Sequence, residues 1–125
     1  MREVIATSQA PAAVGPYSQA IKHNGVIYVS GQLPFDPQTG EECKGSIADK
    51  TTLIMNNLQA IAKEAGSDLS RALKITIFLT DLGNFGTVNE AYAKFFDKEP
   101  PARCCFEVSG LPKGCEIEID AIIAV

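Results

Sequence analysis

The chain has 125 residues, of which 46% are apolar and 21% charged. That length and composition predict one globular domain over residues 1–125. The net charge of −4 and a pI near 4.9 argue against sequence-independent nucleic-acid binding, which needs clustered lysine and arginine. No apolar run approaches the ~20 residues of a membrane-spanning helix, and the first residues lack the apolar segment of a signal peptide. We therefore expect a cytoplasmic protein with neither nucleic acid nor membrane as a partner.

The cysteines predict neither disulfides nor a metal site. They form no CxxC pair, and the single histidine, His23, is far from them in sequence. Without an export signal we expect the thiols to stay reduced, and these spacings do not resemble a zinc site. The sequence also lacks a phosphate-binding glycine loop and a dinucleotide fingerprint, so no cofactor is expected. The cysteines are Cys43, Cys104, Cys105 and Cys115.

The first part of the chain is predicted to form short strands, over residues 3–6, 17–22 and 26–30. Asn24-Gly25 separates the second from the third and is a strong signal for a two-residue hairpin. The third run, VIYVS, is rich in β-branched and aromatic residues. Residues 34–40, PFDPQTG, are predicted to form a loop because they are rich in turn formers.

A helix is predicted to begin after Ser46, with Asp49 completing an acidic variant of the capping box. Apolar residues then recur at helical spacing as far as Ala65, and Gly66 is expected to end the helix. The run LKITIFLT at 73–80 alternates between apolar and mostly polar positions, which predicts a strand.

A second helix is predicted over residues 84–96, with an apolar stripe at helical spacing. Two further strands are expected over 102–109 and 116–125, joined by the turn-rich segment GLPKG. The stripe consists of Phe85, Val88, Tyr92 and Phe95.

The order β-β-β-α-β-α-β-β predicts an α+β fold, with a mixed or antiparallel sheet and both helices on one face. The other face would then carry apolar side chains that need a cover. A semi-apolar face is normally buried, and association of identical chains is the simplest way to bury it. We expect a homo-oligomer. The side chains assigned to this face are Val26, Tyr28, Phe78, Cys105 and Ile122.

Alternation along the strands also groups the residues with chemical potential. Arg103 and Cys105 share one face of their strand, Glu118 points away from the apolar face of the last strand, and Ser30 sits with Val26. We expect Arg103, Cys105, Glu118 and Ser30 to converge on the face without helices. A guanidinium binds a carboxylate through two parallel hydrogen bonds, so this convergence predicts a site for a small carboxylate.

Each of these residues also has a structural interpretation. Arg103 could form a surface ion pair with Glu118 across strands, which contributes about 0–1 kcal/mol. Cys105 could be a half-buried apolar residue, and no histidine nearby in sequence would activate it. The row that contains Glu118 could be a solvated strand face. Tyr17 and Phe85 could serve packing alone.

Several segments in order resemble the Rid family, the YjgF-type enamine/imine deaminases, over essentially the whole chain. They are APAAVGPYSQA at 10–20, VSGQLPFDPQTGE at 29–41, FLTDLGNFGTVNEAY at 78–92, PARCC at 101–105, and LPKG followed by EIEIDAIIA at 116–124. Two departures stand out. The stretch between Phe96 and Pro101 is shorter than is usual in the family, and Cys104 stands where a smaller polar residue is common.

The resemblance implies a chorismate-mutase-like fold and a homotrimer with its sites at the subunit interfaces. It also implies hydrolysis of 2-aminoacrylate and 2-aminocrotonate enamines, and of their 2-imino acid tautomers, to 2-keto acids and ammonia without a cofactor. The alternative is a trimer that binds small carboxylates, or regulates, without catalysis. RNA cleavage has also been attached to the family, but the acidic pI argues against it here.

The resemblance assigns roles to individual residues. Arg103 would bind the substrate carboxylate, Glu118 would orient the attacking water and transfer protons, and Cys105 would line the imine end. The remaining pocket residues would be Tyr17, Ser30, Gly31, Phe85 and Asn89.

Overall fold

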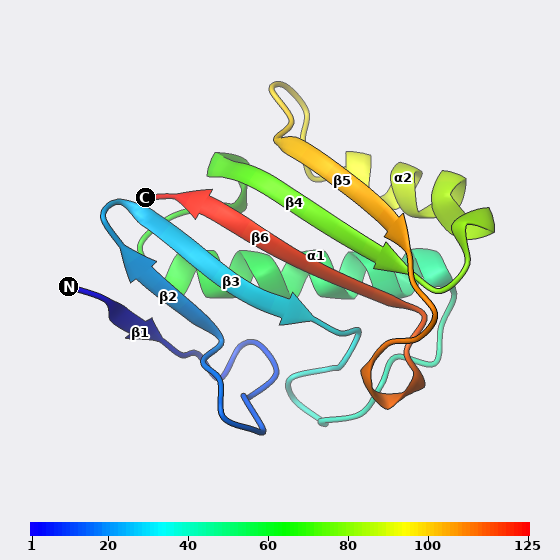
Figure 1. Ribbon diagram of the computed structural model, residues 1–125, viewed down its shortest axis with the longest axis horizontal. Helices are drawn as coiled ribbons and strands as arrows, with labels where there is room; N and C mark the ends of the chain where they lie inside the picture. Colours follow the sequence, from blue (N-terminus) through cyan, green and yellow to red (C-terminus); the bar gives the residue numbers. More distant parts are fainter.

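A computed structural model describes residues 1–125 as a six-stranded sheet with two α-helices against one face (Figure 1). The strand order is β1-β2-β3-β6-β4-β5. The β4–β5 pair is parallel, and every other neighbouring pair is antiparallel. The predicted element order and the placement of both helices on one face are therefore confirmed. We call the face without helices the open face.

The first three strands are β1 (Glu3–Ile5), β2 (Ala20–His23) and β3 (Val26–Gln32). The predicted hairpin is present, with Asn24 at φ 50° and Gly25 at φ 76° between β2 and β3, as a two-residue turn of this type requires. β2 begins at Ala20 rather than at residue 17. The Tyr17 amide donates to the Gly15 carbonyl at 2.8 Å, so a tight turn precedes the strand.

α1 (Ile47–Glu64) begins with the predicted capping box. The Ser46 hydroxyl accepts from the Asp49 amide at 3.1 Å, and the Asp49 carboxylate accepts from the Ser46 amide at 3.2 Å. After the helix, Gly66 adopts φ 85°, a conformation that glycine tolerates without strain. Neither this helix nor the second combines the length and the apolar character needed to cross a membrane.

The rest of the chain forms β4 (Ala72–Leu79), α2 (Phe85–Ala93), β5 (Ala102–Glu107) and β6 (Ile117–Ala124), with 3₁₀ turns at Leu69–Arg71, Leu82–Asn84 and Pro112–Gly114. α2 is shorter than the predicted 84–96. The Asp81 carboxylate accepts from the Gly83 amide at 2.8 Å and caps a 3₁₀ turn in front of the helix. At the other end the backbone changes to i→i+3 hydrogen bonds, because Phe95 and Phe96 donate to carbonyls three residues back.

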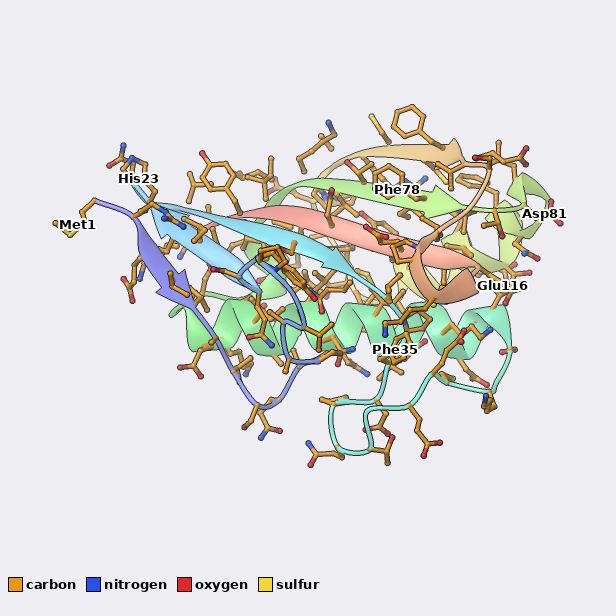
Figure 2. All side chains as sticks on the ribbon, turned by 60° about the horizontal axis from the view of Figure 1, so that its bottom comes forward. Met1, His23, Phe35, Phe78, Asp81 and Glu116 are labelled. Carbon is orange, nitrogen blue, oxygen red and sulfur yellow. The ribbon has the colours of Figure 1, made fainter.

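The core lies between the sheet and the helices. It includes fully buried isoleucines from β3, β4 and β6 together with Ile54, Leu58 and Ile61 of α1. The open face remains uncovered in one chain, with Tyr28 50% exposed and Phe106 52% exposed. Phe78 stacks against Phe106 with ring centroids 6.3 Å apart, and Figure 2 shows Phe78 on the side of the sheet away from α1. The predicted apolar face therefore exists.

Candidate functional site

Arg103 lies against one stripe of α2. Its Nη1 donates to Asn89 Oδ1 at 2.8 Å. The guanidinium carbon lies 5.4 Å from the ring centroid of Phe85 and 4.9 Å from that of Tyr92. Residues 85, 89 and 92 are spaced i, i+4 and i+7, so they share one face of the helix. One helix face thus holds the guanidinium by a hydrogen bond and two aromatic rings.

Arg103 and Cys105 lie on the helix side of the sheet, and their predicted convergence with Glu118 on the open face is wrong. In the parallel β4–β5 pair, Ile75 lies opposite Arg103 and Ile77 opposite Cys105, and both isoleucines are fully buried. Alternation correctly grouped the residues of β5, but their side depends on the register with β4. The alternate row of β5 side chains, which includes Phe106, is more apolar and faces away from the helices. Hydrophobicity alone would therefore place the wrong row of β5 against the core.

Cys105 is half-buried and packs against the core. Burial raises the pKa of the Cys105 thiol, and the nearby Arg103 charge opposes this rise. The thiol is therefore protonated near neutral pH and is a poor nucleophile, since the thiolate is the reactive form. Cys105 is thus a half-buried residue that packs against the core, as its structural interpretation expected, and it also lies near Arg103.

A hollow of about 400 Å³ opens beside Arg103, between α2 and the beginning of β5. Its size is within the range of small-molecule sites. The segment identified as unusually short supplies part of the wall through Pro100 and Pro101. The complete lining is Asn89, Tyr92, Ala93, Phe96, Pro100, Pro101 and Arg103.

Glu118 lies on the open face, where it pairs in register with Phe78. Burial raises the pKa of the Glu118 carboxyl, and repulsion from Asp120 raises it further. Gly31 lies directly beside this carboxyl: a Cβ at position 31 would overlap Glu118 Oε2 and approach its carboxyl carbon to 2.7 Å. Glycine at 31 therefore provides the space that the Glu118 side chain occupies. A carboxyl with a raised pKa is a better proton acceptor than an ordinary one.

Ser30 directly precedes Gly31 in β3, and Tyr17 lines the same hollow as Gly31. The Ser30 hydroxyl donates to the Ser18 carbonyl at 2.6 Å, in the irregular part of β3 between Val29 and Gln32. Tyr17 is 51% exposed and, with Gly31, lines a hollow of about 270 Å³. An exposed ring beside a hollow is not explained by packing within one chain.

The structure divides the eight predicted site residues into two groups. The arginine group consists of Arg103, Cys105, Phe85 and Asn89, and the glutamate group consists of Glu118, Gly31, Ser30 and Tyr17. An Arg103–Glu118 ion pair, the simple structural interpretation, is excluded by this arrangement. The ion pairs of the chain join Lys50 to Glu116 at 2.8 Å and to Glu42 at 3.6 Å. No three His, Cys, Asp or Glu side chains are grouped so as to hold a metal ion.

Tyr92 contacts Arg103 but was predicted only as part of an apolar stripe. The signal was available in the sequence, because Tyr92 lies three residues after Asn89 and seven after Phe85. Two residues already assigned to a pocket on one helix face imply that the third position on that face is close to the same pocket.

The chain is similar to known proteins in both sequence and structure. A family model described as "Endoribonuclease L-PSP" matches residues 7–125. A Sinorhizobium fredii protein named "RutC family protein y4sK" is 51% identical, covering 100% of this chain and 99% of its own length. The rat protein named "2-iminobutanoate/2-iminopropanoate deaminase" is 47% identical, covering 98% of this chain and 89% of its own length.

The fold has close counterparts among solved structures. The crystal structure of Escherichia coli TdcF with bound serine superposes with a TM-score of 0.94 at 40% identity, covering 98% of each chain. This agreement confirms the chorismate-mutase-like fold that the sequence motifs implied. With a family match from residue 7 to the last residue and relatives near 50% identity, the chain belongs to the endoribonuclease L-PSP family, also known as the YjgF/RutC/Rid family.

Proposed function

We propose that this protein hydrolyses 2-aminoacrylate and 2-aminocrotonate enamines, and their 2-imino acid tautomers, to 2-keto acids and ammonia. The observation that carries the proposal is the state of Arg103. Its guanidinium is held by α2, yet it makes a single hydrogen bond within the chain, to Asn89. Most of its donors remain free for a carboxylate, which a guanidinium can bind through two parallel hydrogen bonds.

Two relatives support this substrate class. The rat relative carries the name of an imine deaminase, and the TdcF structure contains serine, a small amino acid with one carboxylate. We expect the protein to act in the cytoplasm as a single domain, without a cofactor or a metal. The substrates would be released there by pyridoxal-phosphate enzymes such as the serine and threonine dehydratases.

In the proposed reaction Glu118 acts on water. Its carboxylate takes a proton from a water molecule, whose oxygen attacks the imine carbon to give a carbinolamine. The proton taken from water goes to the imine nitrogen as the carbinolamine forms. Glu118 then transfers the hydroxyl proton of the carbinolamine to the amino nitrogen, the C–N bond breaks as the C=O bond forms, and ammonia leaves a 2-keto acid. An imine is already electrophilic, so orientation and a positioned base are sufficient and no covalent nucleophile is needed. The raised pKa of Glu118 suits a group that both accepts and returns a proton.

The other residues would shape the pocket. Cys105, with its protonated thiol, would line the imine end of the substrate. Tyr17 and Phe85 would form walls, and Ser30 and Asn89 would hold neighbouring backbone and side-chain groups in place. Gly31 would leave room for Glu118.

We further propose that the complete site forms between two copies of the chain, in the homotrimer implied by the sequence motifs. Arg103 and Glu118 lie on opposite sides of one sheet, so no single copy presents both to one small substrate. The exposed rings of Tyr28 and Phe106 on the open face support association. Light scattering is expected to give three times the chain mass of 13.4 kDa.

The activity is tested by generating 2-aminoacrylate or 2-aminocrotonate in situ from serine or threonine with a dehydratase. Ammonia and keto acid release is then measured with and without this protein. We expect faster release that depends on both Arg103 and Glu118. No acceleration with any precursor amino acid would contradict the proposed reaction.

The alternative is a trimer that binds small carboxylates without turnover. The bound serine in TdcF is the observation that favours it. Calorimetry with 2-ketobutyrate distinguishes the two functions, since a binding protein would retain affinity while the ammonia assay stays at its background rate.

A further inference from the structure

We propose that Tyr92 is a positioning residue, whose ring face fixes the Arg103 guanidinium in the orientation that receives a carboxylate. The inference rests on the proposed function and extends it to a residue outside the eight assigned to the site. Asn89 holds one end of the guanidinium by a single hydrogen bond, which leaves the group free to rotate about that contact. The Tyr92 ring, 4.9 Å from the guanidinium carbon, restricts that rotation.

The Tyr92 ring is itself fixed. The residue is 4% exposed and belongs to the core cluster, and its ring packs against that of Phe96 at 5.1 Å with the planes tilted by 46°. A rigid ring on a helix is a better support for a long, flexible side chain than another flexible side chain would be. Arginine loses much rotamer freedom when it binds a ligand, so support before binding lowers that entropic cost.

The chemistry of the contacts also suits a binding arginine. Arg103 is held by an amide and by two rings, and no carboxylate of the chain forms an ion pair with it. An acidic partner would neutralise the guanidinium and compete with the substrate carboxylate. An aromatic ring attracts the cation without neutralising it. The positive charge therefore remains available to the ligand.

The ring rather than the hydroxyl explains this role. The Tyr92 hydroxyl is buried and has no hydrogen-bond partner, which is unfavourable for folding. Burial raises the pKa of Tyr92, so the hydroxyl stays neutral and forms no ion pair with Arg103. A phenylalanine should thus support Arg103 equally well, whereas an aliphatic side chain should not.

The orientation of Arg103 is tested directly by nuclear magnetic resonance of the arginine side-chain Nε–Hε groups. The chain has only three arginines, Arg2, Arg71 and Arg103, and R103K identifies the signal. We expect nuclear relaxation to show a more rigid Nε–Hε group in Arg103 than in the other two arginines. In Y92L this group should become more mobile, while in Y92F its mobility should not change. Unchanged mobility in Y92L, or the same increase in both variants, would overturn the inference.

Ligand affinity provides the second test, with 2-ketobutyrate as the probe in calorimetry. Y92L should weaken binding about five- to tenfold and raise KM similarly with little change in kcat, whereas Y92F should bind within about twofold of the original protein. V88A is the matched control, because Val88 is a fully buried residue of the same helix that neither lines the hollow nor contacts Arg103. Equal weakening in V88A would reduce Tyr92 to general packing and overturn the proposal. If the original protein binds no keto acid, the proposed function fails, while the resonance experiment still tests Tyr92.

Discussion

Arg103 and Glu118 project from opposite faces of the same sheet, although both strands that carry them flank β4. Arg103 lies opposite the buried Ile75, and Glu118 lies opposite Phe78 on the open face. If both residues act on one small molecule, as proposed, two chains must each contribute one of them.

The division predicts complementation between inactive variants. R103K alone and E118Q alone should each be nearly inactive, but refolding them together should restore activity. With random mixing, about a quarter of the interfaces combine an intact arginine with an intact glutamate, so about a quarter of the original activity is expected. The ammonia assay on the mixed sample checks this, with separately refolded variants as the control. Activity no greater than the sum of the two separate samples would place both residues of a working site in one chain.

R103K should lose most of the activity although it keeps the positive charge. A lysine ammonium is a point charge on a flexible stem and cannot reproduce the planar two-bond contact with a carboxylate. It also loses the hydrogen bond from Nη1 to Asn89. We expect kcat/KM to fall about ten- to a hundredfold, the loss typical of charge-assisted hydrogen bonds. Steady-state kinetics with 2-aminocrotonate measure the effect, and a fall of less than twofold would contradict a clamp.

C105S should be much milder than either of the previous changes. The half-buried thiol has a raised pKa and serves no covalent step in the proposed reaction. A serine keeps the size and a hydrogen-bonding group, so we expect less than about a tenfold loss in kcat. If C105S were inactive while E118Q kept full activity, a thiol mechanism would replace water activation.

The rate should decline in acid with a midpoint above the ordinary glutamate range. Glu118 must be ionised to accept a proton from water, and burial and Asp120 both raise its pKa. Activity is therefore present above the raised pKa and is lost as the pH falls through it. D120N removes the repulsion and should move the midpoint to lower pH. Profiles of kcat/KM against pH for both proteins test this, and a midpoint that does not move would exclude Asp120 as a cause.

G31A should slow turnover by displacing Glu118. The added methyl group would overlap the Glu118 carboxylate, so that side chain must move away from its place. A displacement near 1 Å can reduce the rate about a hundredfold, so a loss of about ten- to a hundredfold is expected. G110A is the matched control, because a Cβ there meets no atom within 4 Å. If both variants kept full activity, the position of Glu118 beside Gly31 would not matter for the reaction.

Local signals in the sequence predicted most of the fold. The Asn24-Gly25 turn and the Ser46–Asp49 capping box depend on a few neighbouring residues, and both are present as predicted. The motifs that implied the family span nearly the whole chain, which explains why they also identified the fold.

The site was predicted less completely because its geometry depends on contacts between distant segments. Alternation shows which residues of β5 share a face, but the register of Arg103 against Ile75 decides which face that is. The same register brings Arg103 to α2, a contact that no pattern within either segment predicts. Tyr92 was consequently seen as a core residue and not as a neighbour of the guanidinium.

The half-buried Glu118 carboxyl also affects the stability of the folded chain. Its pKa is raised on folding, so the unfolded chain holds this proton less tightly than the folded one. Near neutral pH the Glu118 carboxylate is ionised in surroundings that disfavour its charge, which lowers the free energy of unfolding. As the pH falls towards the ordinary glutamate pKa, the carboxyl becomes protonated in the folded chain and this destabilisation is removed. The protein thus retains on the open face of its sheet a group that opposes folding under the conditions in which the proposed reaction needs it, so stability is exchanged for the proposed activity.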